Sequence, residues 1–380
     1  MSLDRVIPSV ATYSLLGRSG LRVSPLCLGT MTFGTEWGWG SPEETARAIF
    51  SRYLSAGGNF IDTADGYTGG TSERLIGQFV RELGCREAVV LATKFTFNTS
   101  LNPGGTKQHS GLGDPNGGGN GRKNIIRACE DSLRRLGTDY IDLYWLHNWD
   151  GMTPVEEVMY ALDSLVRSGK VRYLGFSNVP AWYLGRAQTL AEWRGYERII
   201  ALQYEYSLVE RNIEKEFVPA ALALGLGICP WSPLGGGVLS GKYRRADQGS
   251  IAGEGRLQAM RGAPNPVFDK LTDRNLAVAE VVHEVAQSVG RTPAQVALNW
   301  VCTQPGVTSS IIGASKLAQL EDNLSALDFT IPDALRVRLS DASRLPTEYP
   351  YVFYSEALQG MVRAGTNVLP EPRTFRPRIT

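Results

Sequence analysis

Short apolar runs alternate with longer amphipathic segments along most of the chain. Most of the runs are nearly continuous in apolar residues, which is typical of parallel strands covered on both faces. Eight such runs span residues 26–31, 59–64, 88–95, 141–148, 171–178, 199–207, 226–234 and 309–315. Eight strand-then-helix units in series predict an α/β protein with a closed (β/α)8 TIM barrel rather than an open sheet.

Helix-start and helix-end signals support this reading of the amphipathic segments. Residues 41–44 (SPEE) combine a polar N-cap, a proline at the first helical position and acidic residues in the first turn. Residues 153–156 (TPVE) and 292–295 (TPAQ) repeat this pattern. The other barrel helices are expected at 72–83, 122–137, 180–195, 213–225 and 316–327. Several of these segments end at a glycine, the residue that closes a helix in the left-handed conformation.

Several segments fall outside the repeat. Two extra helices are expected within residues 273–290 and 332–343, and a hairpin at 13–23 is expected to close the bottom of the barrel. Long insertions at 98–121 and 235–271 each follow a strand. They should therefore lie on the C-terminal face, where barrel active sites form. We expect one barrel domain at residues 1–345 and a C-terminal tail at 346–380.

Composition and charge exclude several functions. The 380 residues include 39 Lys and Arg against 38 Asp and Glu, which gives no field for a nucleic acid or an anionic membrane. Only three histidines are present, and five scattered cysteines form no C-x-x-C pair, so we expect no metal site and a reducing, cytoplasmic location. No signal peptide or membrane span is apparent. The expected partner is a small molecule, and a homo-oligomer is left open.

Four chemically active side chains lie at the ends of consecutive predicted strands: Asp62, Tyr67, Lys94 and His147. Singly, each has an ordinary structural explanation, such as a loop cap or a solvated charge. Together they favour proton transfer to a carbonyl oxygen. An ammonium beside a phenol lowers the phenol pKa, a carboxylate keeps that ammonium charged, and a neutral imidazole can orient the carbonyl. We therefore expect Tyr67 to be the general acid.

Two motifs here resemble the signature of the aldo-keto reductase superfamily: residues 60–67 (FIDTADGY) and 72–77 (SERLIG). Residues 138–146 (TDYIDLYWL), 175–178 (GFSN) and 312–315 (IGAS), with Asn323, follow in the family order. Residues 119–124 and 147–150 and the long loop after strand seven are most similar to the aryl-alcohol-dehydrogenase-like branch. That branch is related to the potassium-channel β subunits.

This resemblance implies a (β/α)8 reductase that uses NADPH/NADP+ and no metal, in which Asp62, Tyr67, Lys94 and His147 are catalytic. Ser177, Asn178, Gln203 and Trp231 match residues that hold the nicotinamide. Ser232, Leu234, Gly237, Leu239 and Lys242 match the loop around the pyrophosphate. Gly313, Ser315, Gln319, Asp322 and Asn323 match the adenosine end. Gly29, Thr30 and Met31, at the end of the first strand, are also assigned to the cofactor.

The sequence departs from the family pattern at positions where many members could bind the 2′-phosphate of NADPH. Many family members have Arg and Lys where this chain has Gln319 and Gly313, which leaves Ser315 and Lys316, with Arg244, Arg245 or Arg256 as additional candidates. The same Ser/Gln arrangement occurs in branches that take NADP, so NADPH is expected.

The substrate pocket is expected to include Phe33, Trp37, Phe95 and Trp149. Aromatic walls suit an aryl or a cyclic, sugar-like carbonyl compound. The alternative for Trp37 is that it only packs its own loop. The expected reaction is reversible reduction of an aldehyde or ketone to an alcohol. The alternative is an NADP(H)-binding, redox-sensing regulatory subunit with little turnover, which the four catalytic residues alone do not distinguish.

Overall fold

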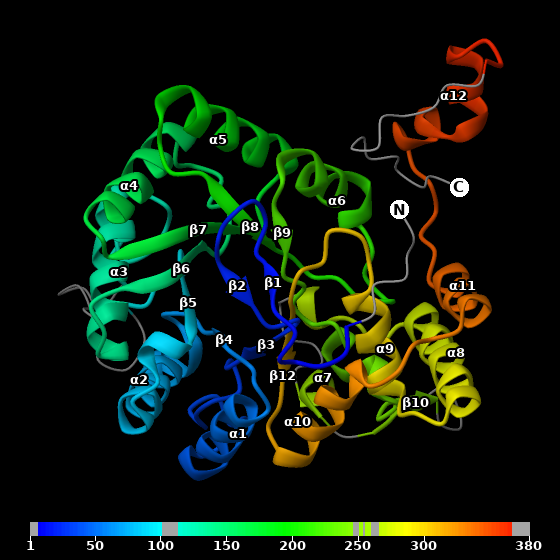
Figure 1. Ribbon diagram of the computed structural model, residues 1–380, viewed down its shortest axis with the longest axis horizontal. Coiled ribbons are helices and arrows are strands. Elements are labelled where there is room, and N and C mark those ends of the chain that lie inside the picture. The colour runs from blue at the N-terminus through cyan, green and yellow to red at the C-terminus, as the bar shows by residue number, and fades with distance from the viewer. Residues whose placement is uncertain (1–6, 101–112, 246–250, 254, 260–265, 367–380) are drawn as a thin grey trace.

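A computed structural model describes residues 7–100, 113–245, 251–253, 255–259 and 266–366 of the chain. Within these residues, a parallel sheet of eight strands curves into a nearly closed barrel surrounded by helices (Figure 1). The strands are β3 (Leu26–Gly29), β4 (Phe60–Asp62), β5 (Val90–Phe95), β6 (Ile141–Leu146), β7 (Val171–Ser177), β8 (Ile199–Gln203), β9 (Gly227–Ile228) and β12 (Ser310–Gly313). A parallel bridge between Ile228 and Val307 links the two ends of the sheet. The predicted (β/α)8 fold is confirmed.

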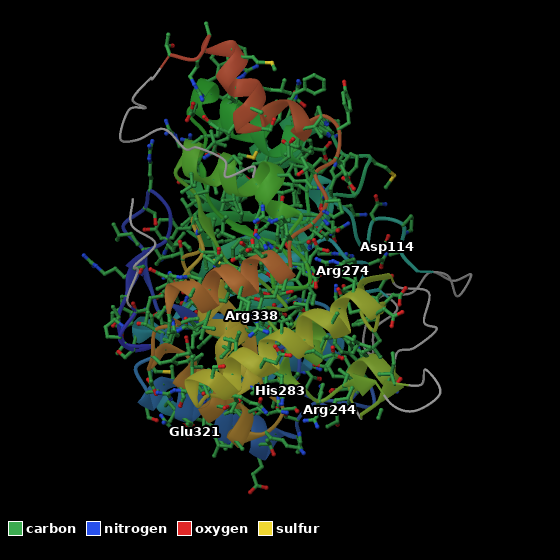
Figure 2. The ribbon with its side chains drawn as sticks, turned by 90° about the vertical axis from the view of Figure 1, so that its right-hand side faces the viewer. Asp114, Arg244, Arg274, His283, Glu321 and Arg338 are labelled. Atoms are coloured by element: carbon green, nitrogen blue, oxygen red, sulfur yellow. The ribbon has the colours of Figure 1, made fainter. Side chains whose placement is uncertain are left out.

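The barrel helices follow their strands as predicted. They are α1 (Glu43–Ser55), α2 (Thr71–Leu83), α3 (Arg122–Leu136), α4 (Val155–Arg167), α5 (Ala181–Arg194), α6 (Ile213–Leu224), α9 (Pro293–Cys302) and α10 (Leu317–Leu324). The two predicted extra helices are α8 (Asp273–Val289) and α11 (Asp333–Ala342). They lie side by side, and Arg338 of α11 pairs with Glu284 of α8 (Figure 2).

The helix-start signals differ in how they act. Thr292 and Gln295 form a full capping box at the start of α9, with both hydrogen bonds at 3.2 Å. The expected cap at Ser41 does not form, because Pro42 is the N-cap of α1. The backbone of Ser41 pairs instead with the preceding loop, through Thr32 O at 2.7 Å and Gly34 N at 2.9 Å.

The predicted N-terminal hairpin is present as β1 (Ser14–Leu15) and β2 (Arg22–Val23). Leu16 and Val23 are fully buried in a cluster inside the barrel, which also contains Phe60, Leu143 and Trp145. The hairpin therefore closes the end of the barrel that lies opposite the strand-end loops. A larger cluster fills the space between the strands and the surrounding helices.

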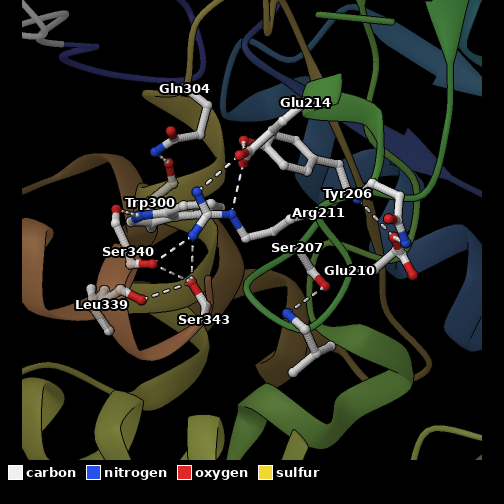
Figure 3. Close-up of polar contacts among 12 residues, drawn as sticks. Tyr206, Ser207, Glu210, Arg211, Glu214, Trp300, Gln304, Leu339, Ser340 and Ser343 are labelled. Carbon is white, nitrogen blue, oxygen red and sulfur yellow. Dashed lines mark hydrogen bonds and ion pairs between the residues drawn. The ribbon is translucent and has the colours of Figure 1, made fainter. Parts of the chain in front are cut away.

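Polar contacts fix the extra helix α11 to the barrel (Figure 3). The Arg211 guanidinium donates to Glu214 Oε1 at 2.8 Å, to Ser340 O at 2.6 Å and to Ser343 Oγ at 2.9 Å. Trp300 Nε1 donates to Ser340 Oγ at 3.1 Å. Helix α11 is thus held by groups from two other segments.

Beyond α11, the chain leaves the barrel and forms a 3-10 turn, η7 (Tyr351–Tyr354), and a short helix, α12 (Glu356–Val362) (Figure 1). Tyr351 Oη donates to Glu216 Oε1 at 2.7 Å, and Lys215 pairs with Glu348 at 2.9 Å. These contacts attach the tail to α6. Among the described residues, no helix has both the length and the apolar character needed to cross a membrane.

Candidate active site

The four predicted catalytic side chains meet at the carboxyl ends of β4, β5 and β6. Lys94 Nζ donates to Asp62 Oδ2, to Thr63 O at 2.7 Å and to Tyr67 Oη at 3.2 Å. The Tyr67 and His147 rings lie 6.0 Å apart, centroid to centroid, at an interplanar angle of 80°. The three strands are direct neighbours in the sheet, so their ends bring these residues together.

Lys94 and Asp62 form a buried ion pair, with side-chain exposures of 0% and 3%. Burial alone lowers the pKa of Lys94, but Asp62 and Tyr67 oppose this and raise it above its ordinary value. Burial raises the pKa of Asp62, and the Lys94 ammonium opposes that rise. Gln203 Nε2 also donates to Asp62 Oδ1 at 3.0 Å. The lysine therefore stands as an ammonium beside the phenol.

Tyr67 begins a 3-10 turn, η1 (Tyr67–Gly70), whose backbone is unusual. Thr68 has a φ of 47°, in the left-handed region that a β-branched residue rarely adopts. Its hydroxyl donates to Phe33 O at 2.7 Å and accepts from Ser72 N at 3.2 Å. These bonds compensate for the strained conformation and fix the turn from which the Tyr67 side chain extends.

His147 follows β6, and its backbone N–H donates to Phe95 O at 3.1 Å. Burial and the nearby Lys94 ammonium lower the pKa of His147 well below its ordinary value. The imidazole is therefore neutral at neutral pH. Its Nδ1 is buried and has no hydrogen-bond partner among the described residues. A neutral ring of this kind can donate a hydrogen bond to a carbonyl oxygen without adding a charge.

Two aromatic rings from the strand-end loops flank Tyr67 and His147. Trp37 lies edge-on to Tyr67 at 6.3 Å, and Phe97 lies edge-on to His147 at 4.8 Å. Trp37 is 41% exposed and Phe97 is 53% exposed, so both rings are accessible. Trp39 packs against Trp37 at 5.3 Å. Phe97 was not among the predicted pocket residues, because its only signal in the sequence is an aromatic side chain three positions after Lys94.

Two other predicted pocket residues, Phe33 and Phe95, have no exposed surface. Phe33 is fully buried against Phe79, at 6.5 Å between ring centroids. Phe95 is fully buried as well, and its ring lies 4.9 Å from the ring of Tyr144. Both rings belong to the hydrophobic core rather than to an accessible wall.

The fourth predicted pocket residue, Trp149, is half-buried. Its ring lies 5.9 Å from that of Trp182, and its backbone N–H donates to Asn178 O at 3.2 Å. These contacts attach the loop after β6 to the loop after β7 and to the start of α5.

The residues predicted to hold a nicotinamide form a row at the ends of β7, β8 and β9. Asn178 Nδ2 donates to Ser177 Oγ at 2.9 Å and to His147 O at 3.0 Å. Trp231 is half-buried against the inner cluster, and its Nε1 is buried without a partner among the described residues. Gln203 is the third member of the row and contacts Asp62.

The end of β3 completes this side of the site. Thr30 donates through both its backbone N–H and its hydroxyl to Asp62 O, each at 3.0 Å. Gly29 and Asp62 are register partners in the β3–β4 pair, and Met31 is half-buried. Thr30 thus ties β3 directly to the strand that carries Asp62.

The loop after β9 turns sharply at Ser232, which has a φ of 50°. A Cβ on Gly237 would lie 2.7 Å from Lys242 Nζ, so the glycine allows the ammonium to approach the backbone. Leu234 is half-buried, whereas Leu239 is fully buried in the core. The Leu239 N–H donates to Leu234 O at 3.2 Å. The Leu239 side chain is therefore occupied by packing.

The residues predicted for the adenosine end lie just before α10 and along it. Gly313 is exposed and has open space beside it. Gln319 Oε1 accepts from Ser315 N at 2.8 Å, and Asn323 Nδ2 donates to Gly313 O at 3.3 Å. Asp322 accepts from Thr292 Oγ1 at 3.0 Å and from Gln295 Nε2 at 2.9 Å.

In this arrangement the Gln319 side-chain oxygen and the Asp322 carboxylate already accept hydrogen bonds from other residues of the chain. Of the arginines considered for the 2′-phosphate, Arg244 is exposed and donates to Gly241 O at 3.2 Å. The side chains of Arg245 and Arg256 lie outside the part of the chain that the structure describes.

Comparison with known proteins identifies the family of this chain. The sequence model of the aldo/keto reductase family matches residues 25–340. The uncharacterized oxidoreductase YrpG of Bacillus subtilis is 38% identical over 339 residues, which cover 87% of this chain and 95% of that protein. The probable voltage-gated potassium channel subunit beta of Oryza sativa subsp. japonica is 36% identical over 318 residues, 83% of this chain and 91% of that protein.

A third relative carries a name that describes a redox reaction. The aryl-alcohol dehydrogenase GME11368 of Pestalotiopsis microspora is 33% identical over 335 residues, which cover 86% of this chain and 82% of that protein. The family model and these relatives confirm the resemblance found in the sequence, including its branch. The chain is an enzyme and belongs to the aldo/keto reductase family.

Proposed function

We propose that this enzyme reversibly reduces aryl or cyclic carbonyl compounds to alcohols, with NADPH as the hydride donor and Tyr67 as the general acid. The observation that carries the proposal is the Lys94 ammonium, which contacts both the Asp62 carboxylate and the Tyr67 hydroxyl. Carbonyl reduction itself is supported at the level of the family and of the aryl-alcohol dehydrogenase relative.

The strand-end residues fit a nicotinamide dinucleotide. Ser177, Asn178 and Gln203 offer hydroxyl and amide groups, and the half-buried Trp231 ring has a buried Nε1 without a described partner. A ring of this kind suits stacking against a flat heterocycle. The Lys242 ammonium lies beside Gly237, and a cation at this position suits a pyrophosphate. When bound, the reduced nicotinamide supplies the hydride.

The other end of the dinucleotide would lie at the start of α10. Gly313 leaves open space there, and Ser315 and Lys316 are candidate partners of a 2′-phosphate. Gln319 would have to release Ser315 N for that backbone group to bind a phosphate oxygen. We infer a preference for NADPH over NADH from these side chains.

The chain's own residues would move one proton and hold one oxygen atom. The substrate carbonyl oxygen would accept hydrogen bonds from Tyr67 Oη and from the neutral His147 ring. Tyr67 would transfer its phenolic proton to that oxygen while the carbonyl carbon receives the hydride. The Lys94 ammonium, 3.2 Å from Oη, would stabilise the phenolate that remains. In the reverse direction, the phenolate would accept the proton of the alcohol.

The accessible rings of Trp37 and Phe97 support a ring-bearing substrate. They flank Tyr67 and His147 from two different loops and are both partly exposed. An aromatic or cyclic carbonyl compound could lie between them with its oxygen toward Tyr67.

A steady-state assay tests this proposal. The purified protein should oxidise NADPH in the presence of aryl aldehydes or ring ketones, with smaller kcat/KM values for short aliphatic aldehydes and for NADH. Tight NADPH binding without turnover on any member of the panel would contradict the proposal. That result would favour the redox-sensing regulatory subunit, a reading kept open by the 36% identity to a potassium channel subunit beta.

A further inference from the structure

A buried charged cluster lies behind the catalytic turn, and the proposed mechanism does not use it. Its centre is Glu73, in the first turn of α2, which is fully buried. Glu73 Oε2 accepts from Arg135 Nε of α3 at 2.5 Å. Glu73 Oε1 accepts from Thr93 Oγ1 of β5 at 2.6 Å. One carboxylate therefore joins two helices and a strand.

The contact with Thr93 links Glu73 to Lys94. Thr93 directly precedes Lys94 on β5, and successive side chains of a strand point to opposite faces. Lys94 extends to the catalytic groups, whereas Thr93 extends to the helix layer and meets Glu73. Glu73 thus holds the outer face of the strand at the point where its inner face carries the ammonium.

The contact with Arg135 links Glu73 to Tyr67. Arg135 packs against Gly70, the last residue of the turn that Tyr67 begins. A Cβ on Gly70 would lie 2.9 Å from Arg135 Cδ and 3.2 Å from its Nε. Gly70 has a φ of 87°, a conformation that glycine adopts without strain. The guanidinium therefore limits where the turn can lie.

Asp65 is a second buried carboxyl group that interacts electrostatically with Glu73. Asp65 is buried, its N–H donates to Lys94 O at 3.2 Å, and its Oδ1 has no described partner. Burial and the Glu73 carboxylate raise the pKa of Asp65 well above its ordinary value, while Arg135 and Lys94 oppose that rise. These effects favour the neutral form of Asp65, whereas Glu73 lies directly against the Arg135 guanidinium.

We propose that Glu73 is a positioning residue for carbonyl reduction: through Thr93 and Arg135 it fixes the separation of Lys94 Nζ and Tyr67 Oη. This inference rests on the proposed role of Tyr67 as the acid. A small displacement of either group would weaken a 3.2 Å hydrogen bond on which proton transfer depends.

The chain offers a matched control at the opposite end of the same strands. Arg86 Nη2 pairs with Asp142 Oδ2 at 2.8 Å, with side-chain exposures of 17% and 14%. Asp142 also accepts from Leu91 N at 2.9 Å, so it likewise joins neighbouring strands. This partly buried ion pair contributes to packing but lies away from Tyr67 and Lys94.

The test compares Glu73→Gln, Thr93→Val and Asp142→Asn with the wild type, measuring kcat, KM, the NADPH dissociation constant and the thermal midpoint. Glu73→Gln should lower kcat about 30-fold and Thr93→Val about 10-fold, with NADPH affinity within about threefold, because misplacing reacting groups costs rate rather than cofactor binding. Asp142→Asn should lower the thermal midpoint and leave kcat within about twofold.

A further readout separates positioning from general stability. If Lys94 loosens from Tyr67, the phenol becomes a weaker acid, so the alkaline limb of the kcat–pH profile should move to higher pH in Glu73→Gln. The proposal is overturned if Glu73→Gln and Thr93→Val keep wild-type kcat, or if Asp142→Asn loses kcat equally. If Glu73→Gln does not fold, Thr93→Val alone decides between these outcomes.

Tyr67→Phe, assayed in parallel, keeps the two proposals distinguishable. If Tyr67→Phe is inactive and the Glu73 and Thr93 variants are fully active, only the positioning role fails. If Tyr67→Phe retains activity, the acid assignment fails, whatever the other variants show.

Discussion

Lys94 and His147 lie in the same site, but their pKa values shift in opposite directions because their charged neighbours differ. Lys94 contacts the Asp62 carboxylate, which opposes the effect of burial and raises its pKa. Burial lowers the pKa of His147, and the Lys94 ammonium lowers it further. At neutral pH the site therefore contains a cation next to the phenol and an uncharged ring beside it.

This difference predicts how stability depends on pH. The pKa of His147 is depressed in the folded protein, so the unfolded chain takes up the proton first as the pH falls. The stability from neutral His147 is complete above about pH 6.5 and is lost below it, by up to about 1.4 kcal/mol per pH unit. Urea unfolding at several pH values between about 7.5 and 5 should show that His147→Asn reduces this loss.

His283, which is exposed on α8, supplies the control for that measurement. His283→Asn should keep the wild-type pH dependence. The raised pKa of Asp65 contributes a slope of opposite sign, but it is common to all three proteins and cancels in the comparison. Equal slopes for wild type and His147→Asn would show that His147 titrates normally.

At the scale of elements, the strands set the distances between the proposed catalytic residues, and the loops supply the exposed aromatic rings beside them. β4, β5 and β6 are neighbours, so Asp62, Lys94 and His147 come together without any contribution from loop sequence. Trp37 and Phe97 come from the loops after β3 and β5 and flank this strand-end group.

Trp37 and Phe97 should determine how well the enzyme binds substrates that contain an aromatic ring. Trp37→Ala and Phe97→Ala should each raise KM for an aryl aldehyde by about tenfold, because each removes roughly 1.4 kcal/mol or more of ring contact. The kcat/KM for a short aliphatic aldehyde should change much less. Steady-state kinetics with both substrates make the comparison.

Trp193→Ala is the matched control, since this tryptophan is 76% exposed near the end of α5. It should leave both substrates unaffected. An equal loss for aryl and aliphatic substrates in the loop variants would argue against a ring-binding role for Trp37 and Phe97.

The sequence predicted the strand-end group better than the walls around it, and the backbone explains why. Parallel strands place their carboxyl ends together, so residues that follow apolar runs must meet. The positions of Phe95 and Phe97 depend on Thr96, whose φ of 129° ends the strand geometry between them. Alternation along the sequence cannot reveal such a turn, and Phe95 was therefore predicted as a wall residue although it lies in the core.

The adenosine end shows the same limit. The motif at residues 312–315 identified the segment predicted to bind adenosine. The sequence could not show that Gln319 accepts a hydrogen bond from Ser315 N, or that Asp322 accepts one from Thr292 at the start of α9. These bonds join residues whose separation depends on how α9 and α10 pack. Contacts between elements are set by packing, which periodicity does not encode.

At the scale of the molecule, the barrel has a proposed catalytic end and a structural end. The strand-end loops form the first, and the hairpin of β1 and β2 closes the second. Leu16 of the hairpin segment is fully buried inside the barrel with Phe60 and Trp145. Changes at this end should alter stability while leaving the chemistry intact.

Leu16→Ala tests this separation. Removing a fully buried leucine side chain should lower the free energy of unfolding by about 2–5 kcal/mol. The kcat of the folded enzyme should stay within about twofold of the wild type at a temperature below the unfolding transition. Urea unfolding and steady-state kinetics measure the two quantities, and a large loss of kcat in folded Leu16→Ala would show that the two ends are coupled.

The Tyr67→Phe substitution tests whether the Tyr67 phenol donates the proton to the substrate carbonyl oxygen. The substitution removes one hydroxyl group and leaves Lys94, Asp62 and His147 in place. We predict a loss of kcat of about a thousandfold or more, within the range attributed to general acid catalysis, with NADPH affinity and thermal midpoint unchanged. A Tyr67→Phe enzyme with near-wild-type kcat would contradict the assignment.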